Sequence, residues 1–407
     1  MLDTFTLAPG FRAAATACGL KTSSAMAASN LDLALVAAEA PCSAAGVFTS
    51  NRVKAAPVLY DQEVLAQNAG SIRAVITNAG NANAVTGAQG LADARQMAAL
   101  TAYALRCQPD QVLVLSTGVI GRPLAMDKVT QGIAVVASPA AEQGAPAAAR
   151  AIMTTDTRPK VASTTVTIAG APVTISGFCK GAGMIHPDMA TLLAIVTTDA
   201  QVAPDVLHNA LKAAADVSFN RISVDGDTST NDTLLLLASG VSGAAIRAGS
   251  DAYAAFVAAL SEVCTSLAKQ VARDGEGATR LIEVVVSGAE DVAQAHAVAN
   301  TIAISPLLKT AVHGGDPNWG RVLMAAGRSG AAIDPARLTL AFGPPEREVV
   351  VLRAGMPTTY AEREAAALFR EDPVYIRLDL GLGSAQTTVW TCDCSKGYVE
   401  INAHYTT

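Results

Sequence analysis

The segment KGAGMIHPDMATLLAIVTTDA, from Lys180 to Ala200, carries the clearest candidate nucleophile in the sequence. Ala190 precedes Thr191, and Thr191 opens an apolar, β-branched run. A threonine hydroxyl becomes an effective nucleophile when a base lies beside it. Cleavage before Thr191 would supply that base as the freed α-amine of the same residue, whose ordinary pKa of about 7.7–8.0 lets it accept a proton near neutral pH. The residues are compatible with N-terminal-threonine chemistry, but taken alone they favour an ordinary strand that starts with threonine, because Ala-Thr pairs are common and threonine suits strands.

Alternating strands and helices are expected to position this segment. Thr191–Thr197 is predicted to be a strand, and a helix should follow over Pro204–Val217. The clearest helix is predicted over Asp251–Arg273, because its apolar residues recur every three or four positions. A hairpin is expected across Gly170, between Thr164–Ile168 and Pro172–Ile175. A further helix is predicted over Ala92–Arg106, and a β-rich tail from Tyr375. The other predicted strands are Arg73–Ile76, Gln111–Leu115, Asp232–Ala238, Leu281–Val286, Leu338–Phe342 and Glu348–Leu352.

These elements predict an α/β protein with substantial antiparallel sheet, in which helices cover layered sheets. A chain of 407 residues is too long for one small core, so one large or two fused α/β units are expected. The Pro- and Ala-rich stretch Ser138–Ala149 is predicted to be a surface excursion. The hydroxyl- and carboxylate-rich GDTSTND, residues 226–232, lacks the spacing of a calcium loop and is interpreted as a structural turn.

Composition narrows the classes of function. The net charge of −6, the absence of a Lys/Arg run and an aromatic content of 4% argue against nucleic-acid binding. Hydrophobic residues make up 51%, but no apolar run reaches the roughly 20 residues of a membrane span. The first residues do not resemble a secretory signal, so a cytoplasmic protein that binds small molecules is expected.

The seven cysteines are odd in number and scattered, which argues against a disulfide framework. Cys392 and Cys394 form a C-x-C pair, but a metal site would need two further ligands and only His404 lies nearby. No metal is expected. No P-loop or dinucleotide fingerprint is present, and no cofactor is expected.

Many separate segments resemble the ornithine acetyltransferase family, also called bifunctional glutamate N-acetyltransferases. The resemblance spans essentially the whole chain. It rests on the Met-Ala-Thr sequence at Thr191 and, in order along the chain, on GFRAAATACGLK, TNAGNANAVTG, LSTGVIG, IMTTDTRPK, FNRISVDGDTSTNDT, DGEGATR, DPNWGRV and the closing INAHYTT.

The resemblance implies a layered α-β-β-α fold of the N-terminal-nucleophile type that cleaves itself between Ala190 and Thr191. Residues 1–190 would form an alpha chain and 191–407 a beta chain, with a smaller C-terminal subdomain over about 281–407. Two alpha and two beta chains would assemble together.

The implied reaction moves an acetyl group from N2-acetylornithine to glutamate in arginine biosynthesis, through an acetyl-threonine intermediate. Some family members also accept acetyl-CoA. Thr191 would be the nucleophile, and Thr117 and Gly118 would form the oxyanion hole. The implied substrate-binding residues are Thr154, Lys180, Thr191, Glu276, Asn402 and Thr407.

The chemistry of an amino-acid substrate suits Lys180 and Glu276, which offer a cation for a carboxylate and an anion for an ammonium. Taken alone, both would more often be solvated charges, and Ser-Thr-Gly would be a strand-to-turn junction. His186, five residues before the cut, is expected in an exposed loop. Two rivals stay open: a hydrolase that releases the same acyl-enzyme to water, and a non-enzymatic amino-acid-binding protein.

Overall fold

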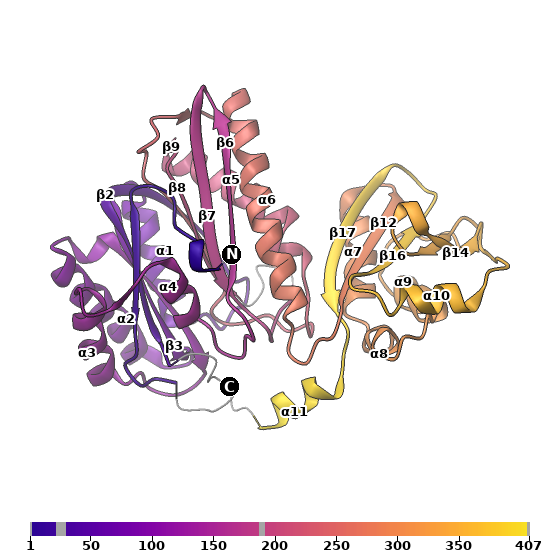
Figure 1. The fold of residues 1–407 in the computed structure, drawn as a ribbon, viewed down its shortest axis with the longest axis horizontal. Helices are drawn as coiled ribbons and strands as arrows, with labels where there is room; N and C mark the ends of the chain where they lie inside the picture. Colours follow the sequence, from indigo (N-terminus) through magenta and orange to yellow (C-terminus); the bar gives the residue numbers. More distant parts are fainter. Residues whose placement is uncertain (1, 22–29, 187–191, 405–407) are drawn as a thin grey trace. The chain divides into compact units, whose positions relative to one another are not determined.

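The computed structural model describes residues 2–21, 30–186 and 192–404. These residues form two compact units (Figure 1). The first unit contains the described residues of 1–220 and 227–271, and the second contains 221–226 and 272–404. Each unit has its own sheet and its own buried core.

One strand, β2 (Leu33–Phe48), organises the sheet of the first unit. Its first part pairs with β3, from Leu33↔Asn78 to Ala37↔Ala74, and its last part pairs with β10, from Ser43↔Ala238 to Phe48↔Thr233. The main path of the sheet runs β4-β3-β2-β10-β8-β7-β6. The other strands of this path are β3 (Ile72–Asn81), β4 (Val112–Val119), β6 (Lys160–Ile168), β7 (Ala171–Lys180), β8 (Leu193–Thr198) and β10 (Thr233–Ala238).

Pairing in this sheet is mixed. β3 with β4 and β8 with β10 are parallel, whereas β2 pairs antiparallel with both β3 and β10. The predicted hairpin is confirmed: β6 and β7 pair antiparallel around Ala169 and Gly170, which have φ of 52° and 80°. Two consecutive positive φ values are typical of a tight hairpin turn. Four short or peripheral strands complete the unit. β1 (Phe11–Thr16) pairs with β2 and with β5 (Glu142–Gln143), and β9 (Gln201–Val202) pairs with β11 (Ala245–Ile246).

Helices cover the sheet of the first unit (Figure 1). The helices α1 to α4 contact β1–β4, α5 contacts β2, and the α6 residues Leu267 and Gln270 contact β7 and β6. The predicted α/β architecture, with helices covering sheets and much antiparallel pairing, is therefore confirmed. The bounds are α1 (Ala56–Asn68), α2 (Gly87–Leu105), α3 (Met126–Val136), α4 (Ala145–Ala151), α5 (Pro204–Val217) and α6 (Asp251–Arg273).

The stretch Ser138–Ala149, predicted to be a surface excursion, contains a short strand and the start of a buried helix in the structure. Residues 142–143 form β5, and α4 begins at Ala145 with five of its alanines buried. Alanine has no side chain beyond Cβ, so α4 can pack closely against β1 and β2. The prediction was wrong because the same small residues suit either a loop or a closely packed helix.

The second unit has a six-stranded sheet in the order β15-β14-β13-β16-β12-β17. Its core includes Phe342 and Phe369, whose rings meet edge to face with centroids 4.6 Å apart. The elements are β12 (Leu281–Ala289), α7 (Val292–Ala303), α8 (Pro306–Gly314), α9 (Trp319–Gly327), β13 (Thr339–Phe342), β14 (Val349–Arg353), β15 (Met356–Pro357), α10 (Glu362–Leu368), β16 (Val374–Asp379), β17 (Ala385–Cys392) and α11 (Lys396–His404). No helix among the described residues of either unit could cross a membrane.

The predicted β-rich tail is only partly right. β16 and β17 begin it as expected, but the last described residues form α11 rather than a strand. Residues 396–404 lack the strict apolar alternation of a half-buried strand, and none of them is buried. Asn402 therefore lies on a helix and not at the end of a sheet.

Candidate active site

The Ser-Thr-Gly sequence lies at the end of β4, where the strand comes very close to β3. Gly118 has φ of +132°, and a Cβ on it would lie 2.3 Å from the carbonyl carbon of Gly80. Such a distance excludes any side chain, so glycine is required where the two backbones meet. The preceding Thr117 is only 8% exposed. The end of β4 therefore places a buried threonine hydroxyl next to the backbone of a glycine.

Asparagines of the neighbouring β3 brace this turn. The Ser116 hydroxyl donates to Asn78 Oδ1 at 2.6 Å, and Asn78 Nδ2 donates to the Asn81 carbonyl at 2.9 Å. Asn81 Nδ2 reaches the carbonyls of Arg122 and Pro123, just beyond β4. These bonds use the polar groups of TNAGNAN to fix the backbone around Thr117, because buried polar groups need partners.

Lys180 brings a buried cation to the same place. It ends β7, is 5% exposed, and its Nζ donates to Thr117 Oγ1 at 3.4 Å. The register pairs Lys180 with Leu193 of β8, two residues after Thr191. Two predicted site residues that are 63 positions apart in the chain are therefore in contact. Ala190, Thr191 and Thr407 lie outside the described residues.

Asp156 is a fully buried carboxylate close to Lys180. Its Oδ1 accepts from Lys160 Nζ at 2.6 Å and from the Gly181 N–H at 2.7 Å, while Oδ2 accepts from the Thr154 N–H at 3.0 Å. Burial alone would raise the pKa of Asp156, but the charges of Lys160 and Lys180 and these hydrogen bonds hold its pKa well below the usual range. Asp156 therefore joins the backbones of Thr154 and Gly181, at two parts of the predicted substrate site.

Asp156→Asn should lower the free energy of unfolding at pH 7 by about 3–5 kcal/mol, because it removes the buried carboxylate that pairs with the Lys160 ammonium. The folded-state pKa of Asp156 is depressed, so its stabilisation is complete above the unfolded pKa of about 4 and is lost as the pH falls below that value. Urea unfolding at pH 7 and at pH 3 measures both effects. The double variant Asp156→Asn/Lys160→Met should recover part of the loss, and a double variant less stable than Asp156→Asn would contradict the pairing.

Lys21 adds a further positive charge near Asp156 and Lys180. Burial lowers the pKa of Lys21 to about 8, with a smaller contribution from Lys180, although Asp32 and Asp156 oppose the shift. The Lys21 ammonium donates to the Leu31 carbonyl at 2.6 Å. Cations that are partly removed from water suit the recognition of a carboxylate.

Two predicted binding residues belong to the second unit. Glu276 is 7% exposed, and its Oε2 accepts a hydrogen bond from Asn402 Nδ2 at 2.7 Å. The structure places these two residues together, and their role in substrate binding stays a prediction.

Sequence reasoning missed three polar residues of the first unit. Asp156 contacts the Thr154 and Lys180 regions, Asn231 contacts the strand of Thr117, and Asp232 contacts Leu192. Asn231 and Asp232 lie in the segment interpreted as a structural turn. The only signal was their polarity between apolar segments, which cannot by itself distinguish a turn from a site. His186, expected to be exposed, is half-buried.

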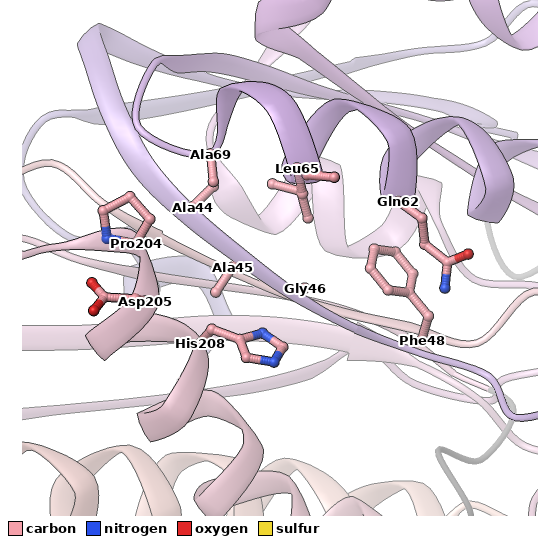
Figure 2. Close-up of a pocket in the computed structure, with 11 residues that line it drawn as sticks. Ala44, Ala45, Gly46, Phe48, Gln62, Leu65, Ala69, Pro204, Asp205 and His208 are labelled. Carbon is pink, nitrogen blue, oxygen red and sulfur yellow. The ribbon is translucent and has the colours of Figure 1, made fainter.

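A separate pocket of about 420 Å³ lies between α1, β2 and α5 (Figure 2). Ala44, Ala45, Gly46, Phe48 and Leu65 give it a mainly apolar wall, and Asp205 and His208 lie at one side. None of the predicted site residues lines this pocket. The candidate active site is therefore the polar cluster at the ends of β4 and β7.

Comparison with known proteins agrees with this picture. The model of the ArgJ family matches residues 12–407. Arginine biosynthesis bifunctional protein ArgJ of Symbiobacterium thermophilum is 49% identical over 399 residues, covering 98% of this chain and 97% of that relative. Its namesake from Dehalococcoides mccartyi is 48% identical, covering 98% and 96%. The crystal structure of ArgJ from Bacillus halodurans is 44% identical with a TM-score of 0.50, covering 52% of this chain and 98% of that chain.

The mixed α/β fold, the buried polar cluster and these relatives define an acyltransferase of amino-acid biosynthesis. The chain belongs to the ArgJ family. The resemblance found in the sequence motifs is confirmed, as is the predicted class of an arginine-biosynthetic transferase with more than one activity.

Proposed function

We propose that this protein transfers the acetyl group of N2-acetylornithine to glutamate through an acetyl ester on Thr191. The observation that carries the proposal is the buried contact between Lys180 and Thr117, beside Gly118, whose close approach to Gly80 requires a glycine, in a chain of the ArgJ family. A cation for a carboxylate then lies next to donors for an oxyanion, which is the arrangement that transfer of an acyl group between amino acids needs.

In the first half-reaction, the α-amine of Thr191 takes the proton of its own hydroxyl as Oγ attacks the acetyl carbonyl carbon. The carbonyl oxygen becomes negative and accepts hydrogen bonds from the Gly118 N–H and the Thr117 hydroxyl. The C–N bond breaks, and the departing ornithine nitrogen takes the proton held by the α-amine. The acetyl group stays on Thr191 Oγ.

In the second half-reaction, the amino group of glutamate attacks the acetyl ester and loses a proton to the α-amine. Thr191 Oγ leaves, takes that proton, and acetylglutamate is released. Lys180 would hold the α-carboxylate shared by both substrates, and Glu276 would suit the ornithine ammonium. Thr154, Asn402 and Thr407 complete the proposed binding set.

Self-cleavage between Ala190 and Thr191 would create the α-amine that this chemistry requires. Strand pairing supports the persistence of a cleaved protein, because β7 precedes the proposed cut, β8 follows it, and the two strands pair from Ile175↔Thr198 to Lys180↔Leu193. The crystal structure of the Bacillus halodurans protein matches 52% of this chain. That share is close to the size of the proposed fragment 191–407.

Intact mass spectrometry of the purified protein should show two fragments of 190 and 217 residues in place of one chain of 407. The two should elute together under native conditions, since they share a sheet. Incubation with N2-acetylornithine should add one acetyl group to the fragment 191–407 alone, and glutamate should remove it. Fully active protein that consists of one uncleaved chain would refute the proposal.

The rival functions differ in how the acetyl-enzyme is discharged. A hydrolase would lose the acetyl group to water at the same rate with and without glutamate, whereas a transferase retains it until the amine arrives. A binding protein would never become acetylated. By family resemblance we also propose acetyl-CoA as a second donor and assembly of two alpha and two beta fragments.

A further inference from the structure

The polar segment Thr228–Asp232 of the first unit has no role in the proposed reaction. Three of its carbonyls accept hydrogen bonds from the segment after β2: Thr228 from Asn51 Nδ2, Ser229 from Thr49 Oγ1, and Thr230 from the Ala55 N–H. The segment is therefore fixed on one side along its length. Its last two residues direct their side chains elsewhere.

Asn231 holds the strand of the oxyanion hole. It is 7% exposed, and its Nδ2 donates to the carbonyls of Ser116 at 2.8 Å and Ala82 at 2.7 Å, while Oδ1 accepts from the Thr230 hydroxyl at 2.6 Å. The Ser116 carbonyl and the Thr117 N–H belong to one planar peptide group. Asn231 therefore fixes the orientation of the Ser116–Thr117 peptide group, which directly precedes Gly118.

Asp232 holds the residue that follows the nucleophile. It is 1% exposed, and its Oδ1 accepts from the Leu192 N–H at 3.0 Å. The Leu192 carbonyl accepts from the N–H of Thr233 at 3.0 Å. Both polar backbone groups of Leu192 are thus held by two consecutive residues.

We propose that Asn231 and Asp232 are positioning residues that set the distance between Thr191 and the oxyanion hole. The proposal rests on the proposed function, because it takes Thr191 as nucleophile. The two side chains come from adjacent residues, whose Cα atoms are about 3.8 Å apart in any trans peptide. Because Asn231 binds Ser116 and Asp232 binds Leu192, the adjacent pair would hold the oxyanion hole and the nucleophile at a fixed distance from each other. This distance matters because a displacement of about 1 Å can lower the rate 10²-fold.

The test measures single-turnover acetylation of the fragment 191–407 by N2-acetylornithine, on protein confirmed to be folded and cleaved. Asn231→Ala should slow acetylation by about 10²-fold while KM changes less than about threefold. Thr49→Val is the matched control. It removes the buried hydrogen bond to the Ser229 carbonyl of the same segment, and the one that Thr49 Oγ1 accepts from the Asn51 N–H, without changing the bonds to Ser116 or Leu192. This variant should acetylate at close to the native rate.

Two variants of Asp232 provide an independent test if Asn231→Ala fails to fold. Asp232→Asn retains an oxygen that can accept from Leu192 and should stay within about threefold of the native rate, whereas Asp232→Ala should lose about 10²-fold. Native-rate acetylation by Asn231→Ala or by Asp232→Ala would overturn the proposal, as would equal losses in the Thr49→Val control. Failure of the native protein to become acetylated would instead overturn the proposed function.

Discussion

Thr191→Ala should leave one intact chain of 407 residues with no measurable acetyl transfer. The substitution removes the hydroxyl that would attack Ala190 and, later, the acetyl donor. Loss of a hydroxyl nucleophile in a comparable acyl-transfer enzyme costs about 10⁶-fold in kcat. Gel electrophoresis, intact mass and a transfer assay measure cleavage and activity on the same sample.

Thr191→Ser is the matched control, because it retains a hydroxyl and an α-amine after cleavage. It should yield two fragments and keep part of the activity. A purified alanine variant that still separates after residue 190 would assign the nucleophile to another residue. A cleaved but inactive serine variant would show that the threonine methyl group also contributes to placing the hydroxyl.

Thr117→Ala should lower kcat by about 10²–10³-fold, or roughly 3–4 kcal/mol of transition-state stabilisation, with little change in KM. The lost hydroxyl matters mainly once the carbonyl oxygen carries negative charge, so kcat and kcat/KM should fall together. Steady-state kinetics with N2-acetylornithine and glutamate measures this, after cleavage of the variant has been confirmed. Thr117→Ser retains the hydroxyl and should recover most of kcat.

Lys180→Ala provides the contrast. Its ammonium would pair with the substrate carboxylate in the ground state, so KM should rise at least as much as kcat falls. The two variants must be compared because Lys180 and Thr117 are in contact, and loss of activity alone would not separate their roles. A Thr117→Ala enzyme with raised KM and native kcat would make Thr117 a binding residue.

The regular spacing of apolar residues allowed the first and last residues of two helices to be predicted from the sequence. The bounds of α5 and α6 agree with the sequence prediction, because their apolar side chains recur at helical spacing and face the core. β3 was predicted to end at Ile76 but continues to Asn81. The Asn- and Gly-rich end of β3 has turn-like composition, and its pairing with β2 at Thr77 and Asn78 and with β4 as far as Asn81 keeps it extended.

The grouping of the site depends on relations that local patterns do not contain. Lys180 contacts Thr117 although four strands lie between β7 and β4 in the sheet order, so their contact depends on the three-dimensional course of the sheet, which no short segment specifies. The Asp156–Lys160 pair has the spacing of many exposed helical pairs, yet it lies at and before the start of β6 and is fully buried. The motifs could therefore suggest the residues of the site, whereas their contacts required the fold.

The central place of β8 in its sheet also bears on how such a protein is made. β8 pairs with β7 on one side and β10 on the other, so the proposed cut would free a strand end inside the sheet. Two separately translated halves would each expose unpaired inner strand edges, because β7 and β2 would lack β8 and β10. Such edges are open to pairing with wrong partners. One continuous polypeptide can instead fold before it is divided. The topology of the sheet would then require folding to come before cleavage. It would also favour a single reading frame that encodes both halves of the enzyme.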